Sequence, residues 1–148
     1  MAALDLTIQG LGRFATMPAR ATLARWITAA LERDAELVLR FVGASEGRRL
    51  NRSFRGRDYA TDVLTFDYVQ APRVQADIVI CPPVVRRAAL ERGLPFRAHL
   101  AHLVVHATLH AQGYEHDRAV AARKMEAREV DILARLGVGD PYAVAGNS

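Results

Sequence analysis

The chain has 148 residues, of which 51% are hydrophobic, so it can form one domain with a buried core and needs no cross-links. The single cysteine, Cys81, excludes an internal disulfide, and no apolar run approaches the roughly 18 residues of a membrane span. The formal net charge is +4, and the N-terminus lacks the layout of a signal peptide, so we expect a soluble cytoplasmic protein.

The first elements predict a parallel strand pair. Leu4, Leu6 and Ile8 alternate with polar residues, which indicates a half-buried strand. A helix is expected from Thr16–Pro18 to about Asp34, because proline is tolerated in a first helical turn. A second apolar strand follows over residues 36–42. A strand, a helix and a strand of these lengths predict a right-handed parallel crossover.

A basic segment comes next. Residues 45–54 predict a short helix, and residues 55–60 a loop. Five arginines fall within ten residues of this segment: Arg48, Arg49, Arg52, Arg55 and Arg57. Such a run is usually a solvated helix face. Beside a metal site, however, it favours an anionic substrate.

The second half of the chain predicts two strands and three helices. The strands cover residues 63–67 and 76–81 and are expected to be antiparallel because their link is short. The helices cover about residues 82–92, 97–112 and 117–136. The tail from about residue 138 is expected to be loosely ordered. No linker divides the chain, so residues 1–148 are expected to form a single domain.

Three of the five histidines have the spacing of metal ligands. His106 and His110 lie four residues apart and therefore on one face of a helix. Gly113 can end that helix in a left-handed conformation, and the turned chain can return His116 to the same point. Three imidazoles with one open position are typical of a catalytic zinc site, so we predict one Zn²⁺ per chain.

The same spacing occurs in the metzincin proteases, which carry a glutamate directly after the first histidine as general base. Here that position is Ala107. The metal ligands are therefore present without the peptidase's base, which favours another hydrolysis. A metalloprotease stays open as an alternative.

Other polar residues near the motif have competing interpretations. Arg55 is the best candidate for stabilising charge on a phosphate. Glu115 and Asp117 are weaker candidates that could orient His116, and Asp117 is about equally well explained as the N-cap of the last helix. The remaining polar residues are expected to be structural: His99 and His102 as satisfied, partly buried side chains, and Glu126, Arg128 and Glu129 as solvated surface.

Three blocks of the sequence resemble the YbeY family of bacterial metal-dependent endoribonucleases. The histidine block, residues 106–116, is similar to the family pattern H-G-x-L-H-L-x-G-x-D-H. Leu50-Asn51, Phe54-Arg55 and residues 61–66 match a second block, and residues 76–80 a third. The likeness spans about residues 50–142. Ala107, Glu115 and Ala76 depart from the family's Gly, Asp and Gly, and we expect the Ala107 methyl close to the metal.

The resemblance implies zinc ligands at His106, His110 and His116 and a functional role for Arg55. It implies an α+β fold, with about five helices around a four-stranded mixed sheet of three parallel strands and one antiparallel strand. The implied activity is cleavage of single-stranded RNA in late 16S rRNA 3′-end maturation and ribosome quality control, with the small ribosomal subunit as partner. A non-catalytic ribosome assembly factor with a structural metal site is the alternative from another class.

The sequence leaves two points open. Either water or the RNA's own 2′-hydroxyl could attack phosphorus, since no dedicated general base is evident. No aromatic surface for stacking bases is apparent either.

Overall fold

A computed structural model describes residues 2–143. The elements follow the predicted order: β1 Leu4–Gln9, a 3₁₀ turn Leu11–Arg13, α1 Arg20–Ala30, β2 Ala35–Phe41, α2 Ala44–Arg55, β3 Val63–Val69, β4 Val74–Ile80, α3 Pro82–Glu91, α4 Phe96–Ala111 and α5 Ala119–Arg135. The first helix is shorter than expected. Proline disfavours helical backbone in the residue before it, here Met17, which opposes a helix that begins at Thr16. Ala19 and Leu31 are extended and mark the two ends of α1.

The strands form one sheet in the order β1-β2-β4-β3. β1 pairs with β2 and β2 with β4 in parallel, while β3 pairs with β4 in the antiparallel sense. The expected mixed sheet of three parallel strands and one antiparallel strand is confirmed. β3 is an edge strand, so the outer row of its backbone N–H and C=O groups has no strand partner among residues 2–143.

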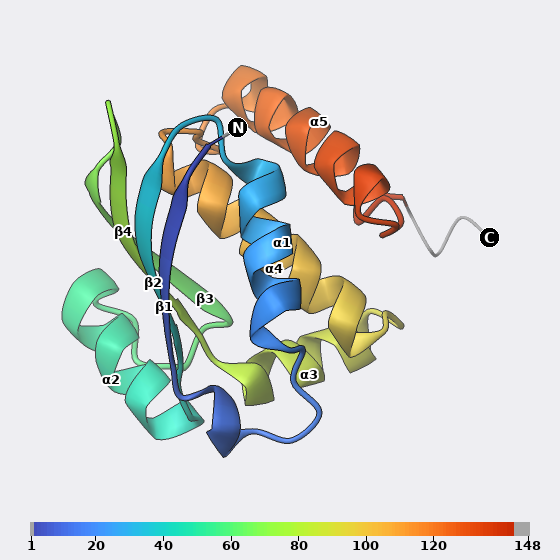
Figure 1. The fold of residues 1–148 in the computed structure, drawn as a ribbon. Coiled ribbons are helices and arrows are strands. Elements are labelled where there is room, and N and C mark those ends of the chain that lie inside the picture. Colours follow the sequence, from blue (N-terminus) through green and yellow to red (C-terminus); the bar gives the residue numbers. More distant parts are fainter. Residues whose placement is uncertain (1, 144–148) are drawn as a thin grey trace.

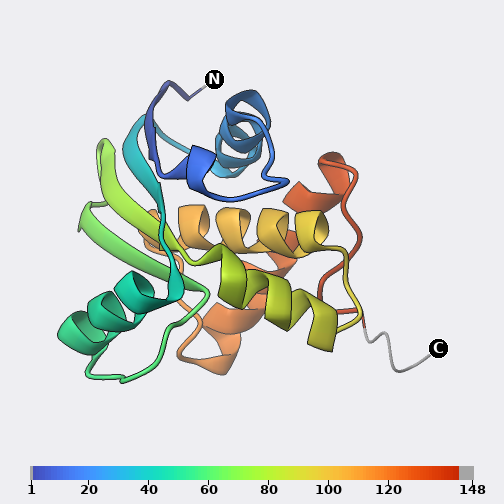
Figure 2. The same cartoon turned by 90° about the horizontal axis from the view of Figure 1, so that it is seen from below.

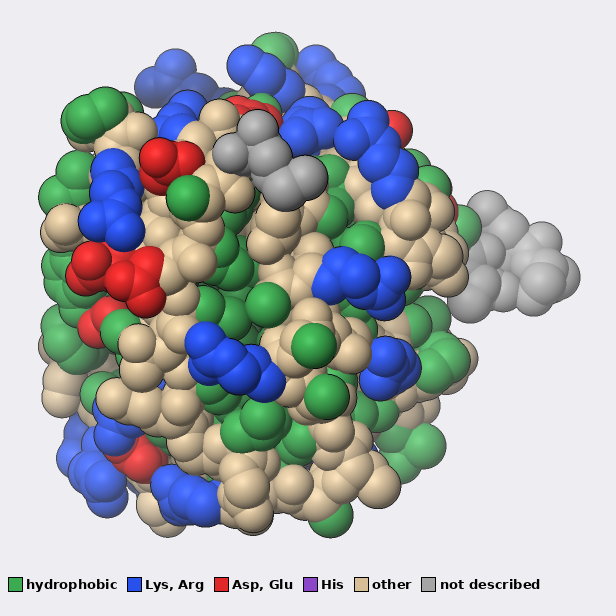
Figure 3. All heavy atoms as spheres, viewed as in Figure 1, with side chains coloured by type: hydrophobic (Ala, Val, Ile, Leu, Met, Phe, Trp, Pro, Cys, Tyr) green, Lys and Arg blue, Asp and Glu red, His purple; other side chains and the backbone are tan. Residues whose placement is uncertain are grey.

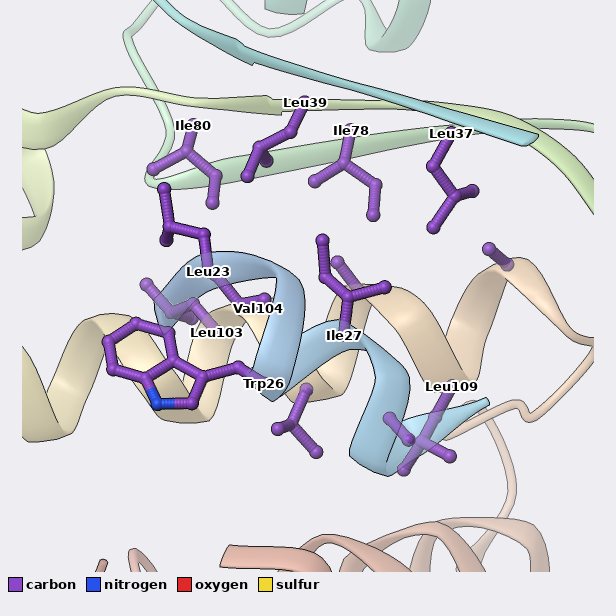
Figure 4. Packing of buried hydrophobic residues seen from close by; sticks show 14 of the residues in the cluster. Leu23, Trp26, Ile27, Leu37, Leu39, Ile78, Ile80, Leu103, Val104 and Leu109 are labelled. Atoms are coloured by element: carbon purple, nitrogen blue, oxygen red, sulfur yellow. The ribbon is translucent and has the colours of Figure 1, made fainter. Parts of the chain in front are cut away.

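The sheet buries its two faces unequally. On one face, alternate residues of β2 and β4, among them Leu37, Leu39, Ile78 and Ile80, point toward α1 and α4, as Figure 4 shows. On the other face a smaller apolar cluster forms around Val79 and is covered by α2 (Figure 1). The result is an α+β single domain with most of its core between the sheet and α4.

α4 runs through the middle of the molecule, between α1, α3 and α5 (Figure 2). Eleven of its sixteen residues are buried, including His99 and His102. Its last turn is tied to the end of α1 by Gln112, whose side chain donates to the Ala30 carbonyl at 2.8 Å and accepts from the Glu32 amide at 2.7 Å. These bonds fix the position at which the chain leaves α4.

The tail from residue 138 to Ala143 is held by hydrogen bonds, in contrast to the loose order expected from the sequence. The Val138 amide donates to the Leu133 carbonyl at 2.8 Å, and Arg92 donates to the Pro141 carbonyl at 3.1 Å. The Tyr142 hydroxyl donates to the buried carboxylate of Glu129. The expectation of a loose tail is therefore corrected for residues 138–143, because hydrogen bonds hold them to α3 and α5; residues 144–148 lie outside the described part.

Among residues 2–143, no helix combines the length and the apolar character needed to cross a membrane. Lys and Arg side chains are spread over the face shown in Figure 3 rather than gathered in one patch, and no histidine is visible on it.

Candidate metal centre

The C-terminal half of α4 and the loop after it bring three histidines together. His106 and His110 are one helical turn apart. Gly113 has φ 104°, a left-handed conformation that turns the chain back. The His116 ring then lies 5.2 Å from the His106 ring and 6.0 Å from the His110 ring, measured between centroids. Two imidazoles sharing a tetrahedral zinc through 2.0–2.1 Å bonds have centroids roughly 5 Å apart, so the spacing of His116 from each helical ring is close to that of such a site.

Hydrogen bonds select the tautomers of the two helical rings. His106 Nδ1 lies 2.9 Å from a Glu129 carboxylate oxygen, and His110 Nδ1 lies 3.0 Å from the Tyr114 carbonyl oxygen. Both partners only accept, so the proton sits on Nδ1 in each ring, and in the neutral imidazole Nε2 is then the atom with the lone pair. This arrangement orients imidazoles in metal sites.

Glu129 on α5 is the residue that sequence reasoning missed. It was assigned to the solvated surface, but its exposure is 0%. Burial by itself would raise the pKa of this carboxyl, yet hydrogen bonds from His102, His106 and Tyr142 outweigh burial and lower the pKa to about 2. A signal was present in the sequence: Glu129 is four residues after Met125 and four before Leu133, on the buried stripe of α5.

A second donor group overlaps the first. One ligand atom each of His102, His106 and Glu129 lie within 4.8 Å of one another. In this group Glu129 already accepts hydrogen bonds from both rings, and two of the three residues are buried. The trio of His106, His110 and His116 instead borders an open pocket and leaves Nε2 atoms unused. The open trio is therefore the better candidate for a catalytic ion, with Glu129 orienting His106.

The three histidines share a pocket of about 500 Å³ with Arg55. The edge strand β3, from Val63 to Phe66, and the end of α2 also line this pocket. α2 stops directly after Arg55 because Gly56 adopts a left-handed conformation, with φ 68°. The pocket therefore combines imidazoles, a guanidinium and unpaired strand backbone.

Asp62 also lines this pocket and is its only carboxylate among residues 2–143. Its Oδ1 accepts from the Val63 amide at 2.8 Å. The preceding loop is anchored by the buried side chain of Asn51, which donates to the Tyr59 carbonyl at 2.8 Å. Asn51 and Asp62 both belong to the sequence block that resembles the family, although neither was singled out.

The weaker candidates fall outside the pocket lining. A Glu115 carboxylate oxygen lies 3.9 Å from His110 Nδ1, not beside His116. Asp117 is exposed, and α5 begins at Ala119 with Arg118 as N-cap and no side-chain capping bond, so Asp117 is not the cap. The Ala107 methyl packs into the hydrophobic core. His102 is buried, and its Nε2 is bonded to Glu129, while its Nδ1 has no hydrogen-bond partner among residues 2–143. His99 is buried, and both of its ring nitrogens lack a partner within the same residues, so neither histidine is fully satisfied as expected.

Comparison with known proteins places this chain in a family. The family model described as Endoribonuclease YbeY matches residues 15–137. The Endoribonuclease YbeY of Aromatoleum aromaticum is 50% identical over 143 residues, covering 95% of this chain and 93% of that protein. That of Polaromonas naphthalenivorans is 56% identical over 124 residues, covering 83% and 82%. The solution structure of TM1509 from Thermotoga maritima superposes with a TM-score of 0.58 at 25% identity, over 93% of this chain and 98% of that one. The chain therefore belongs to the YbeY endoribonuclease family.

Proposed function

We propose that the protein is a zinc-dependent endoribonuclease that cleaves single-stranded RNA. The observation that carries the proposal is the shared pocket, because Arg55 and the three histidines line one polar cavity at the edge of β3. The names of the relatives, all Endoribonuclease YbeY at 50% identity or more, support the same activity.

His106, His110 and His116 would hold the ion, and imidazole ligands suit zinc, although they also suit nickel and cobalt. When bound, the metal supplies a Lewis acid for a phosphoryl oxygen. Glu129 and the Tyr114 carbonyl orient two of the rings. Arg55 stabilises negative charge on the phosphate oxygens, and it has no ion-pair partner among residues 2–143 that would compete for this task.

Asp62 is the pocket residue best suited to accept a proton from the attacking hydroxyl. Only its Oδ1 is engaged by hydrogen bonds within the described residues. A carboxylate within reach of the nucleophile can contribute general-base catalysis of about 10²–10⁴-fold. Glu115 and Asp117, the acids favoured by sequence position, do not line the pocket.

The metalloprotease alternative loses support from the same geometry. A peptidase of this spacing needs a carboxylate directly after the first ligand. Here that residue is Ala107, whose side chain lies in the hydrophobic core. Substituting glutamate there would bury an unpaired charge and would not supply a base to the pocket.

We further propose that the natural substrate is the 3′ region of 16S rRNA, that the partner is the small ribosomal subunit, and that the protein acts in the cytoplasm in ribosome quality control. These assignments rest on the family resemblance. Accumulation of 3′-extended 16S rRNA in cells without the protein, corrected by the wild type but not by an Arg55→Ala variant, would support them. Normal 3′ ends in such cells would contradict them.

The activity is tested on purified protein by elemental analysis and by cleavage of single-stranded RNA and casein before and after chelation. We expect about one zinc per chain, RNA cleavage that stops with chelator and returns with zinc, and no casein cleavage. Casein cleavage would instead favour the protease. Stoichiometric zinc without any RNA cleavage would favour a non-catalytic assembly factor.

A further inference from the structure

A second hollow adjoins the metal pocket. It has a volume of about 330 Å³ and lies on the sheet face that carries α2. Phe54 and Phe66 line both this hollow and the metal pocket, so the two spaces lie next to each other at these rings. Its other walls include Leu50, Tyr68, Asp77 and Arg40.

Aromatic rings in this hollow are exposed to an unusual degree. Leu64, Phe66 and Tyr68 alternate along one face of β3, and only Leu64 is buried. Tyr68 is 63% exposed and Phe54, on α2, is 64% exposed. In Figure 1, α2 covers only the lower part of this face of the sheet and leaves the upper part of the β3–β4 hairpin uncovered. Hydrophobic side chains accordingly show along that edge of the molecule in Figure 3.

The rings are held in place despite their exposure. Phe54 and Phe66 pack with centroids 4.4 Å apart, and the Tyr68 hydroxyl donates to Asp77 at 2.8 Å. A flat aromatic group added to either exposed ring would remove apolar surface from water at little cost in side-chain order. Fixed exposed rings of this kind suit a planar ligand.

The charged residues that line the hollow are Arg40 and Asp77, and the unpaired positive charge lies on α2 and directly after it, toward the metal pocket. Arg48 is neutralised by Asp58 through two bonds of 2.8 and 2.9 Å, and Arg40 pairs with Glu46. Arg49, Arg55 and Arg57 have no acidic partner among residues 2–143. Unpaired guanidiniums beside exposed aromatic rings are the combination with which proteins bind single-stranded nucleic acid.

We propose that Phe54, Phe66 and Tyr68 form a stacking surface for bases of a single RNA strand whose backbone continues past Arg55 into the metal pocket. This inference rests on the proposed function, because it assigns the strand's path to the same site. Stacking is tolerant of sequence, since every base has a π face, and it requires unpaired bases. The surface therefore selects single-stranded RNA over duplex.

The test is the affinity of the zinc-loaded protein for a nuclease-resistant, fluorescent single strand of about 12 nucleotides. Phe54→Ala and Tyr68→Ala should each raise Kd about 5- to 150-fold, the equivalent of losing one stacked base. Tyr68→Phe keeps the ring and should bind like the wild type. Zinc content should be unchanged in all three variants.

Leu90→Ala is the matched control, because Leu90 is an exposed apolar residue on α3 that lines neither hollow. It should leave Kd unchanged. A protein partner is the other occupant that an exposed apolar surface could have, and it predicts RNA affinity that is insensitive to Phe54→Ala. An unchanged Kd in both alanine variants overturns the stacking surface.

The result also separates this inference from the proposed activity. Wild-type protein that binds the strand through Phe54 and Tyr68 but cleaves no RNA supports the surface and contradicts the nuclease. Wild-type protein that cleaves RNA while the alanine variants bind normally supports the nuclease and contradicts the stacking surface. Absence of any binding by the wild type overturns both.

Discussion

The two ends of α4 each place histidines beside a cavity, but the cavities differ in chemistry. At the start of the helix, His99 and His102 border a space of about 480 Å³ that is also lined by Trp26 and by residues 136–141. At the end, His106 and His110 border the polar pocket with His116 and Arg55. Both pairs come from one continuous helix. Glu129 joins them, because it bonds to His102 on one side and to His106 on the other.

The difference shows that what faces a histidine decides its role. His99 lies against apolar surface, and burial, Arg92 and His102 lower the pKa of its ring. His106 and His110 each have an acceptor behind the ring and open space in front of it. We therefore expect a structural role for the histidines at the start of the helix and ligand binding by those at its end.

The largest expected effect comes from removing a proposed ligand at the polar end. His110→Ala should abolish stoichiometric zinc binding and lower RNA cleavage more than about 10³-fold, because a Lewis acid contributes several kcal/mol of charge stabilisation. Circular dichroism should show a folded protein, since the core does not include the His110 ring. An unfolded variant would mean that the metal is structural, and the contrast between the two ends of α4 would fail.

Arg55→Ala should lower cleavage by about 10²–10³-fold, the usual cost of losing one donor to a developing negative charge. Zinc content should not change, because Arg55 is a pocket wall and not a ligand. Arg87→Ala, the same substitution on an exposed residue of α3 that lines neither hollow, is the control. Loss of zinc in Arg55→Ala would contradict the assignment of Arg55 to the substrate.

Glu129→Gln tests the link between the two ends. The amide keeps the shape but cannot accept from two rings as a carboxylate does, so zinc affinity should fall about 10- to 100-fold in competition with a chelating dye. Glu126→Gln makes the same change on the same helix, at a residue that bonds to neither histidine within the described structure. Equal affinity in the two variants would show that Glu129 does not orient His106.

The smallest expected effect is at the apolar end. His99→Leu should leave zinc and cleavage unchanged and raise the free energy of unfolding by about 1–3 kcal/mol, because two buried ring nitrogens without partners are removed. The His99 pKa is lowered from 6.5, so the unfolded chain binds this proton first and wild-type stability falls as pH drops below 6.5. Urea melts at neutral and acidic pH should show a smaller pH dependence in the variant. A destabilised variant would show that the His99 ring is satisfied after all.

Much of the fold was predictable because the signals are local. Alternation in residues 4–9, the double proline at the start of α3 and Gly113 after α4 each specify a conformation within a few residues. The histidine spacing belongs to the same class, since one helical turn is enough to align His106 with His110. The boundaries of α1 were less predictable, because Pro18 and Ala19 are extended before the helix begins.

The sequence by itself determined the order of the elements and which three histidines could converge, since both depend on contacts along one short stretch of chain. Only the tertiary structure decided what faces them. Glu129 is 23 residues beyond His106, and it reaches that ring because α5 packs on α4. Phe54 and Tyr68 line one hollow because α2 packs on this sheet face but leaves the far end of β3 exposed. Such contacts depend on how helices and strands pack on one another, and the spacing of residues along the chain does not specify that packing.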